Sequence, residues 1–350
     1  MSDASAAPEA ALSVEQISAN RSTSALIAAV GRGACWLVSA AALAFVAGCY
    51  SLRPDACTFI TLFPPWCWAV GGLALLWLGH AKRHRWRTGV LVAAWPVFLL
   101  LAADAPASFF RACLPTPNRD DTIRVVTLNC AGNSGAAEDV RRLQPDIILL
   151  QESPTADTLS ALATEMYGSA SNLVRGFDPS ILSRGKVTQV VVPPQYYQNF
   201  VHARVELDGR TINVISLRLF PCPVNLEFWS ADCWRYYETN RQNRRRQLAT
   251  IADYARSLPA DQPLIIGGDF NCPPRDAALQ LLEPWLTDAF TVAGRGWGAT
   301  IIEVADLPLI RIDQIWTNAK LRAVNAFAER AYSSDHHMAV ADFSFTARQD

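Results

Sequence analysis

The chain has 350 residues, of which 51% are hydrophobic and only 18% are charged, and this composition excludes a disordered or collagen-like protein. Residues 1–118 carry eight basic and five acidic side chains, net +3, whereas residues 119–350 carry 23 and 27, net −4. An acidic C-terminal segment is a poor general binder of nucleic acid, because long-range attraction to a polyanion needs a positive potential. The nine cysteines show neither Cys-x-x-Cys nor a Cys/His zinc spacing, so a structural zinc site is not expected.

Three uncharged segments dominate the first third of the sequence. Residues 33–52 and 57–79 are each long enough to cross about 30 Å of hydrocarbon as a helix. A third segment is uncharged over 88–103 and reaches residue 110 only if Asp104 lies at a membrane interface. Because these segments lack a polar face for water, we predict an all-α transmembrane region with helices at about 33–52, 57–79 and 88–110.

The orientation of these helices follows from the basic residues in the short loops. Residues 80–87 contain four Lys or Arg, whereas the connection after the first segment contains only Arg53. We therefore expect the tail of residues 1–32 and the 80–87 loop in the cytoplasm. Three spans would place everything after residue 111 outside the cytoplasm, and two spans would leave it inside.

The organism class is suggested by composition alone. The chain has 28 Arg against three Lys, which is typical of a GC-rich bacterial genome. The prediction is therefore a multi-pass protein of the bacterial inner membrane, whose C-terminal domain is periplasmic or extracellular. The lipid bilayer is its expected partner, and no protein partner is predicted.

From residue 122 to 350, after a proline-containing linker at 111–121, short strand-like apolar runs alternate with helical patterns, as in a mixed α/β domain. Polar side chains recur where these runs end. Side chains at strand ends often converge on a ligand, and carboxylate and amide oxygens suit a hard cation such as Mg²⁺. Each residue taken singly also fits a turn or a cap. The residues concerned are Asn129, Glu152, Asp269, Asn271, Asp313, Asp335 and His336.

These strand-end motifs together resemble the endonuclease/exonuclease/phosphatase family, which includes deoxyribonuclease I and neutral sphingomyelinase. The resemblance covers about residues 122–345 and implies an α+β fold, a four-layer α/β/β/α sandwich with the site at one edge of two packed sheets. The motifs are VVTLNCAG (125–132), PDIILLQES (145–153), ILSRGKV (181–187), PLIIGGDFNCPP (263–274), RIDQIW (311–316) and SSDHHMAVADF (333–343).

The resemblance also implies a metal site. Glu152 matches the principal metal ligand, Asn129 lies beside it in the family pattern, and Asp335 matches a further carboxylate close to the metal. The expected cofactor is Mg²⁺, with Mn²⁺ as the alternative. A divalent cation can stabilise the charge that develops on phosphoryl oxygens during hydrolysis.

The remaining family positions imply the catalytic groups. Asp269 matches the residue that aligns or deprotonates the attacking water, and Asn271 matches the donor to the phosphoryl oxygens. His336 matches the imidazole that faces the scissile phosphate, and Asp313 its orienting partner. A carboxylate beside an imidazole raises the imidazole pKa and fixes its tautomer, which suits this role.

One position departs from the family pattern. Members often carry a histidine in a Thr-His-Leu stretch of a central strand, and the aligned residue here is Arg218. Arginine can bind phosphate with two parallel hydrogen bonds but cannot act as an acid or base near neutral pH. We therefore expect Arg218 either to bind the substrate phosphate or to form a surface ion pair. The departure weakens the case for a nuclease more than the case for a metal-dependent hydrolase.

The resulting prediction is a membrane-anchored, divalent-metal-dependent phosphoesterase that hydrolyses a phosphodiester or phosphomonoester by metal-assisted attack of water. A membrane-tethered nuclease and a non-catalytic ligand-binding module on the same fold remain as alternatives. The substrate is a phosphate ester whose class the sequence leaves open, nucleic acid included, because loops select the substrate on a shared fold.

Three features outside the motifs carry expectations of their own. The aromatic segment 220–237 is expected to be a loop that covers a sheet edge or contacts lipid or substrate. The basic cluster 241–246 is expected to be mostly a solvated helix face, with a patch for nucleic acid or lipid headgroups as the alternative. If the domain is outside the cytoplasm, two disulfides are plausible, Cys222–Cys233 and Cys49–Cys57.

Overall fold

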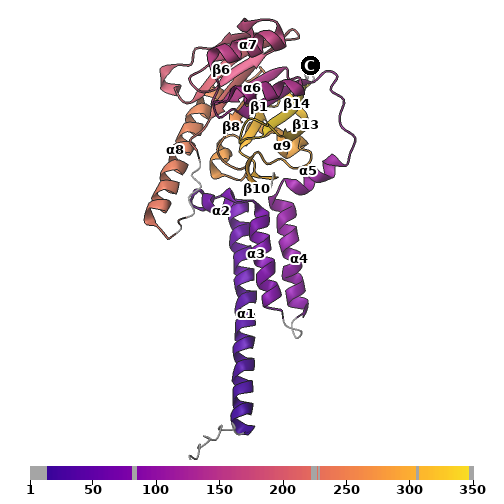
Figure 1. Cartoon of the computed structure of the whole chain (residues 1–350), viewed down its shortest axis with the longest axis vertical. Helices are drawn as coiled ribbons and strands as arrows, with labels where there is room; N and C mark the ends of the chain where they lie inside the picture. The colour runs from indigo at the N-terminus through magenta and orange to yellow at the C-terminus, as the bar shows by residue number, and fades with distance from the viewer. Residues whose placement is uncertain (1–13, 81–84, 222–226, 228, 305–306, 347–350) are drawn as a thin grey trace, which may run out of the picture. The chain divides into compact units, whose positions relative to one another are not determined.

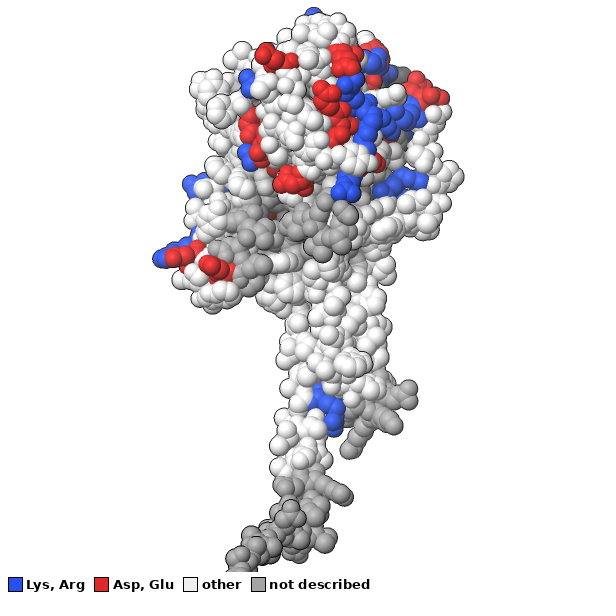
Figure 2. Space-filling model, in the orientation of Figure 1, with Lys and Arg blue, Asp and Glu red and all other residues white. Residues whose placement is uncertain are grey.

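The computed structural model describes residues 14–80, 85–221, 227, 229–304 and 307–346. The chain divides into two compact units. One, called here the helical unit, comprises Met1–Ala47 and Trp66–Leu101; the other, the sheet unit, comprises Gly48–Pro65 and Ala102–Asp350. Figure 2 shows that acidic and basic side chains gather on the sheet unit, while the helical unit is almost uniformly uncharged on that face.

The helical unit is built from three apolar helices, α1 (Val14–Leu52), α3 (Pro65–Leu78) and α4 (Arg85–Ala102) (Figure 1). Ser39 Oγ donates to the Gly72 carbonyl at 2.9 Å, and Trp95 Nε1 donates to Ser39 Oγ at 3.2 Å. A Cβ at Gly72 would lie 2.0 Å from the Trp95 ring, so only glycine lets α4 approach α3 this closely. Small residues and buried hydroxyl contacts of this kind are typical of helices packed within a membrane.

Among the described residues, one helix is long and apolar enough to cross a membrane by itself, over Thr23–Leu52. The segments predicted as the second and third spans are bent helix pairs. Asp55–Leu62 and Pro65–Leu78 meet at 76°, and Trp86–Ala102 and Ala105–Ala112 meet at 73°. Each pair is long and apolar enough to cross a membrane only if its two helices count as one span. Proline explains both breaks, since Pro65 and Pro106 lie at or next to the first position of the following helix. The number of spans stays a prediction.

In the described part of the chain the sheet unit contains two six-stranded sheets and a two-stranded hairpin. The first sheet has the order β13-β14-β1-β2-β4-β3 and the second β5-β6-β7-β8-β12-β9. The strands are β1 (Ile123–Asn129), β2 (Ile147–Gln151), β3 (Leu173–Arg175), β4 (Ser180–Ser183), β5 (Lys186–Gln189), β6 (Phe200–Leu207), β7 (Arg210–Arg218), β8 (Leu264–Asp269), β9 (Thr287–Asp288), β10 (Ile301–Val304), β11 (Leu307–Ile310), β12 (Asp313–Thr317), β13 (Leu321–Glu329) and β14 (Met338–Phe345).

Alternation along the strands creates three hydrophobic layers. In β2, Ile147 and Leu149 belong to the core between the two sheets, whereas Ile148 and Leu150 belong to the core on the outer face of the first sheet. Successive side chains of a strand point to opposite faces, so a strand with apolar residues at every position is covered on both. Helices α6 (Ser134–Asp139) and α7 (Ala156–Tyr167) contribute to the outer core of the first sheet, and α8 (Ala231–Arg256) to that of the second. The predicted four-layer sandwich is confirmed.

The connection after α1 folds with the sheet unit. The buried side chain of Arg53 binds Glu283 Oε1 at 2.5 Å and donates to the Asp276 carbonyl at 2.6 Å. Two residues further on, the Asp55 carboxylate lies 2.8 Å from Arg241 and 3.2 Å from Arg245. Residues 48–65 are therefore an integral part of this unit.

A second contact of this kind lies at the break between α4 and α5 (Ala105–Ala112). The Asp104 carboxylate lies 2.8 Å from a guanidinium nitrogen of Arg311, which also binds Asp288 at 2.8 Å. Arg311 is buried, and a buried cation is tolerated only when its charges are paired. The connection leading out of α4 is thus fixed to the sheet unit as well.

Three expectations need correction. The last seven residues of the aromatic segment 220–237 are helical, since α8 begins at Ala231 after a Ser230 N-cap. Within the cluster 241–246, Arg244 is buried and paired with Asp276 at 3.0 Å, so this face is not simply solvated. Cys49 and Cys57 are free thiols in hydrogen-bond contact, and Cys222 lies outside the described residues.

Candidate active site

The site lies where strands of both sheets end. Asn129 is the last residue of β1 and Asp269 the last of β8, and Asp313 begins β12. The antiparallel register of β8 and β12 pairs Asp313 directly with Asp269. The parallel register of β1 and β2 pairs Asn129 with Gln151, so Glu152 follows at the same edge. The topology thus gathers residues that are up to 184 positions apart in the sequence.

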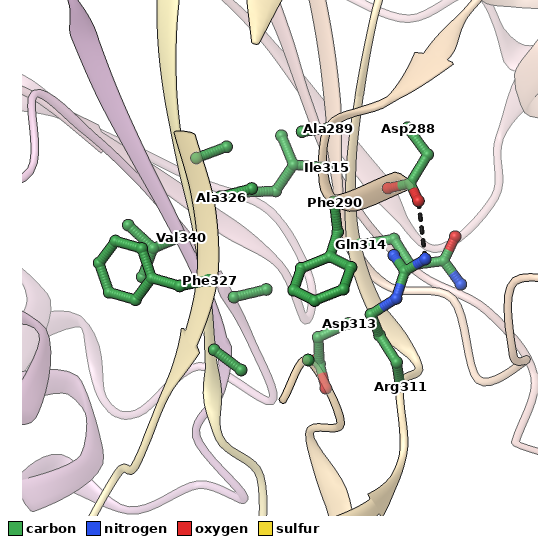
Figure 3. A pocket seen from close by; sticks show the side chains of 14 residues that line it. Asp288, Ala289, Phe290, Arg311, Asp313, Gln314, Ile315, Ala326, Phe327 and Val340 are labelled. Atoms are coloured by element: carbon green, nitrogen blue, oxygen red, sulfur yellow. Dashed lines mark hydrogen bonds and ion pairs between the residues drawn. The ribbon is translucent and has the colours of Figure 1, made fainter. Parts of the chain in front are cut away.

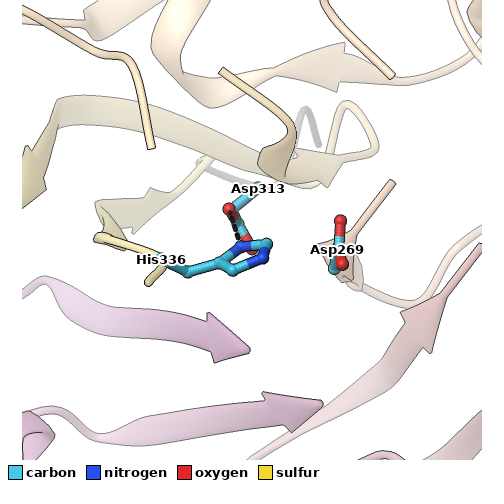
Figure 4. Close-up of side chains that lie close together, drawn as sticks. All are labelled: Asp269, Asp313 and His336. Carbon is cyan, nitrogen blue, oxygen red and sulfur yellow. Dashed lines mark hydrogen bonds and ion pairs between the residues drawn. The ribbon is translucent and has the colours of Figure 1, made fainter. Parts of the chain in front are cut away.

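Asp269, Asp313 and His336 form the buried half of the site (Figure 4). One ligand-type atom from each lies within 4.8 Å of those of the other two. His336 Nδ1 lies 2.9 Å from Asp313 Oδ2. Ser334 Oγ accepts from the His336 main-chain N–H at 3.0 Å and donates to the Asn129 carbonyl, which ties the histidine loop to the end of β1.

Two asparagines hold the Asp269 carboxylate in place. Its Oδ1 accepts the main-chain N–H of Asn271 at 2.9 Å, and its Oδ2 accepts the side-chain amide of Asn271 at 3.0 Å. The Asn129 amide donates to the same Oδ2 at 3.1 Å. Asn271 has a left-handed backbone with φ of 49°, a conformation that asparagine adopts more readily than most residues. This backbone conformation lets both the main-chain N–H and the side-chain amide of Asn271 donate to Asp269.

Glu152, Arg218 and Asp178 form the open half of the site. Arg218 Nη2 lies 2.6 Å from Glu152 Oε1, and its Nη1 lies 3.1 Å from Asp178 Oδ2. Asp178 also accepts the main-chain N–H of Glu152 at 2.9 Å. The Glu152 and Arg218 side chains are 35% and 28% exposed, so solvent reaches this ion pair. The Asn129 amide, which donates to Glu152 Oε1 at 3.0 Å, links the two halves.

The electrostatics of the buried half raise the pKa values of both Asp269 and His336 above their ordinary values. Burial raises the pKa of Asp269 to about 7, and the negative charge of Asp313 adds to the rise, while His336 opposes it. Burial alone would lower the pKa of His336, but the carboxylates of Asp313, Asp269 and Asp335 raise it to about 9. An acid and a base with pKa values on either side of working pH can exchange protons with a substrate.

Seven of the eight residues predicted from the sequence meet here: Asn129, Glu152, Arg218, Asp269, Asn271, Asp313 and His336. Asp335 is exposed beside His336 and lies outside the buried group; it acts on the His336 pKa through its charge. Sequence reasoning missed Asp178, which contacts both Glu152 and Arg218. Its signal was weak, because it lies in a short turn three residues before the ILSRGKV motif.

The residues present fit a divalent cation. Asp313 Oδ1 is buried and has no hydrogen-bond partner among the described residues, and such an orphaned oxygen is rare unless an ion or water satisfies it. The Glu152 carboxylate and the Asn129 amide supply the oxygen-donor types that Mg²⁺ prefers.

A narrow cavity of about 10 Å³ lies between the sheets behind Asp313, with the Arg311–Asp288 pair in its wall (Figure 3). A cavity of this size has room for about one water molecule. It is therefore not a substrate pocket.

Comparison with known proteins agrees with this geometry. The model of the "Endonuclease/Exonuclease/phosphatase family" matches residues 126–336, more than half of the chain, so the chain belongs to this family. Its members are typically hydrolases of phosphate esters that depend on a divalent metal. The predicted family is thereby confirmed.

Individual relatives are more distant. The chain is 28% identical over 212 residues to the uncharacterized protein YbhP of Escherichia coli K12, a match that covers 56% of this chain and 82% of YbhP. A crystal structure of an endonuclease/exonuclease/phosphatase from Beutenbergia cavernae aligns with 17% identity over 65% of this chain and 72% of that one, at a TM-score of 0.48. The D. rerio TDP2 protein, crystallised with a single-strand DNA product, aligns with 16% identity at a TM-score of 0.46. That alignment covers 64% of this chain and 100% of the TDP2 chain.

Proposed function

We propose that the protein is a membrane-anchored, divalent-metal-dependent phosphoesterase that hydrolyses a phosphate ester by attack of water. The main support for this proposal is that Asp269, Asp313 and His336 converge in one buried group, which the Asn129 amide joins to Glu152. Glu152 and Asn129 would hold the cation, which supplies positive charge to the phosphoryl oxygens and the attacking water.

The protein's own groups then divide the chemistry. Asp269, held by three amide hydrogen bonds, receives the proton of the attacking water. His336 is protonated below its pKa of about 9 and offers Nε2–H to the phosphoryl oxygens, while Asp313 fixes Nδ1. Asn271 donates its main-chain N–H and one amide hydrogen to Asp269 and its other amide hydrogen to the Leu219 carbonyl, so in this arrangement it positions the base and has no amide hydrogen left for phosphate. Donors held in place in this way stabilise charge that develops in the transition state.

Arg218 has a double role in this proposal. Its ion pairs with Glu152 and Asp178 hold the guanidinium at the open edge of the site, where a phosphate oxygen can replace the Glu152 contact. A guanidinium suits this exchange because its planar fork binds phosphate as readily as carboxylate.

The same ion pair favours a second candidate, a ligand-binding module without catalysis. If Arg218 retains the Glu152 carboxylate permanently, no cation is held there and the site binds a phosphate group without hydrolysing it. Metal binding separates the two candidates, because the module would show none.

For the cellular location we propose three spans and a sheet unit outside the cytoplasm. The Arg53–Glu283 and Arg311–Asp104 contacts support it, because they tie the ends of α1 and α4 to the same unit and hence to the same side of the membrane. The basic 80–87 loop would then lie on the cytoplasmic side, as the distribution of positive charge favours. A fusion of alkaline phosphatase after residue 118 should be active in the periplasm, and an inactive fusion would contradict this topology.

The activity is tested with the full chain in detergent micelles. The substrates are bis-(p-nitrophenyl) phosphate, p-nitrophenyl phosphate, plasmid DNA, RNA and mixed phospholipids, each with Mg²⁺ and with EDTA. We expect hydrolysis of at least one substrate that requires the metal and is lost in Glu152→Gln and His336→Asn. Glu206→Gln, an exposed carboxylate on β6, is the matched control and should retain activity. Metal-independent hydrolysis, or full activity in both site variants, would overturn the proposal.

A further inference from the structure

We propose that the first two turns of α8 and the residues just before it form a membrane-contacting surface, whose partner is the headgroup region of the lipid bilayer. Three large aromatic side chains are exposed there within eight residues: Trp229 by 84%, Trp234 by 45% and Tyr236 by 52%. We call these three residues the aromatic surface. Clustered exposed aromatics on a protein mark a surface that has a partner, and Trp and Tyr favour the membrane interface.

Direct contacts place this surface next to the end of the membrane helix. The Phe59 ring packs edge-on against Trp234 and Tyr237, at 5.1 and 5.5 Å between centroids. Asp55, in the same connection, pairs with Arg241, which lies about two helical turns after Trp234 in α8. Asp55 comes three residues after Leu52, the last residue of α1, so about 10 Å of chain at most separates them. The start of α8 therefore lies close to the bilayer surface if Thr23–Leu52 spans it.

The lining of the adjoining cavity also suits lipid. A cavity of about 320 Å³ opens between residues 56–62 and the start of α8. Its wall includes Phe59, Leu62 and Trp234, together with the charged side chains of Glu238 and Arg241. The apolar part of this wall suits an acyl chain at the interface, while Arg241 is already paired with Asp55 and Glu238.

This surface would set the height of the site above the membrane. Gln247, further along α8, donates to the Arg218 carbonyl at 3.0 Å and accepts the Phe220 N–H at 2.8 Å. The helix is continuous from Trp234 to Gln247, which corresponds to about 20 Å along its axis. One end of α8 would then rest on lipid while its middle supports the strand end that carries Arg218. This consequence rests on the proposed activity, whereas the lipid contact rests only on the proposed anchoring of the chain by Thr23–Leu52.

The contact is tested by photocrosslinking of the full chain in nanodiscs of phosphatidylethanolamine and phosphatidylglycerol. A benzophenone-bearing amino acid replaces Trp229 or Tyr236, and Phe177, a fully exposed aromatic residue in the turn before β4, is the matched control. Mass spectrometry should find about tenfold more lipid adduct at positions 229 and 236 than at 177, because only interfacial side chains meet lipid steadily.

Equal lipid labelling at all three positions would overturn the inference, and so would crosslinks from 229 and 236 to a second copy of the chain in place of lipid. Circular dichroism and cooperative thermal unfolding verify that each labelled protein is folded. A protein that labels lipid at 229 and 236 but hydrolyses none of the phosphate esters would leave this inference standing and count against the proposed activity alone.

Discussion

The two halves of the candidate site differ in how far solvent reaches them and in how firmly their side chains are held. In the buried half, Asp269 accepts three amide hydrogen bonds and His336 is fixed by Asp313, so the geometry is set before any substrate arrives. In the open half, Glu152 is neutralised by Arg218 in an exposed ion pair that a ligand can displace. The comparison suggests that the buried half carries the chemistry and that the open half controls which metal and substrate enter.

The largest effect should come from the buried half. Asp269→Asn keeps the shape of the side chain but removes the base, so kcat should fall by about 10³-fold with little change in KM, as expected for loss of a general base. Steady-state kinetics with the best substrate of the panel measures this. A kcat within a factor of a few of wild type, from a folded variant, would contradict the assignment of Asp269 as base.

Arg218→Gln should change two properties in opposite directions. Removal of the positive charge beside Glu152 should tighten Mg²⁺ binding by about tenfold, because the cation no longer competes with a guanidinium at 2.6 Å. The loss of a phosphate contact should raise KM by a similar factor. Calorimetric titration of Mg²⁺ and kinetics measure the two effects. Tighter metal binding with an unchanged KM would show that Arg218 pairs with Glu152 but does not bind the substrate phosphate.

Metal binding should stabilise the fold through the open half. At a Mg²⁺ concentration of about 100 times Kd, a site present only in the folded state adds about 2.7 kcal/mol, which raises Tm by a few degrees. Thermal unfolding with Mg²⁺ and with EDTA measures the shift, which Glu152→Gln should abolish and Glu206→Gln should retain. A shift of the same size in Glu152→Gln would place the metal elsewhere.

An effect of similar size to that of the metal distinguishes His336 from a second buried histidine. His202 binds the Tyr254 hydroxyl at 2.7 Å and Asn213 at 3.1 Å, and no carboxylate is among these partners. Burial lowers the pKa of His202 to about 4, so the folded state holds it neutral while the unfolded chain protonates it below about 6.5. Stability is therefore complete above pH 6.5 and falls by about 3 kcal/mol as the pH drops to 4. Urea unfolding of wild type and His202→Gln between pH 7 and 4 tests this, and identical pH slopes would contradict it.

The sequence allowed the buried half to be predicted because its signals are local. Asp269 ends β8, Asp313 begins β12 and His336 stands two residues before β14, and the strand order then brings them together. The layered fold was predictable for the same reason, since strands such as β2 are apolar at four consecutive positions, Ile147–Leu150, and must be covered on both faces.

What could not be predicted depends on contacts between distant segments. Asp178 lies in a turn without periodicity, and it joins the site only because β4 pairs with β2. The burial of Arg53 against Glu283 joins positions 230 residues apart, and nothing in the loop around Arg53 indicates it. The helix breaks near residues 63 and 103 did have a signal, because Pro64, Pro65 and Pro106 stand there, but hydrophobicity alone predicts unbroken spans.

The most direct test of the central claim is the hydrolysis rate of bis-(p-nitrophenyl) phosphate as a function of Mg²⁺ concentration, for the wild-type protein and Glu152→Gln. The account predicts saturable activation by Mg²⁺, no rate in EDTA, and a variant that needs far more metal or shows no activity. A rate that is insensitive to EDTA, or an identical Mg²⁺ dependence in the two proteins, would contradict it.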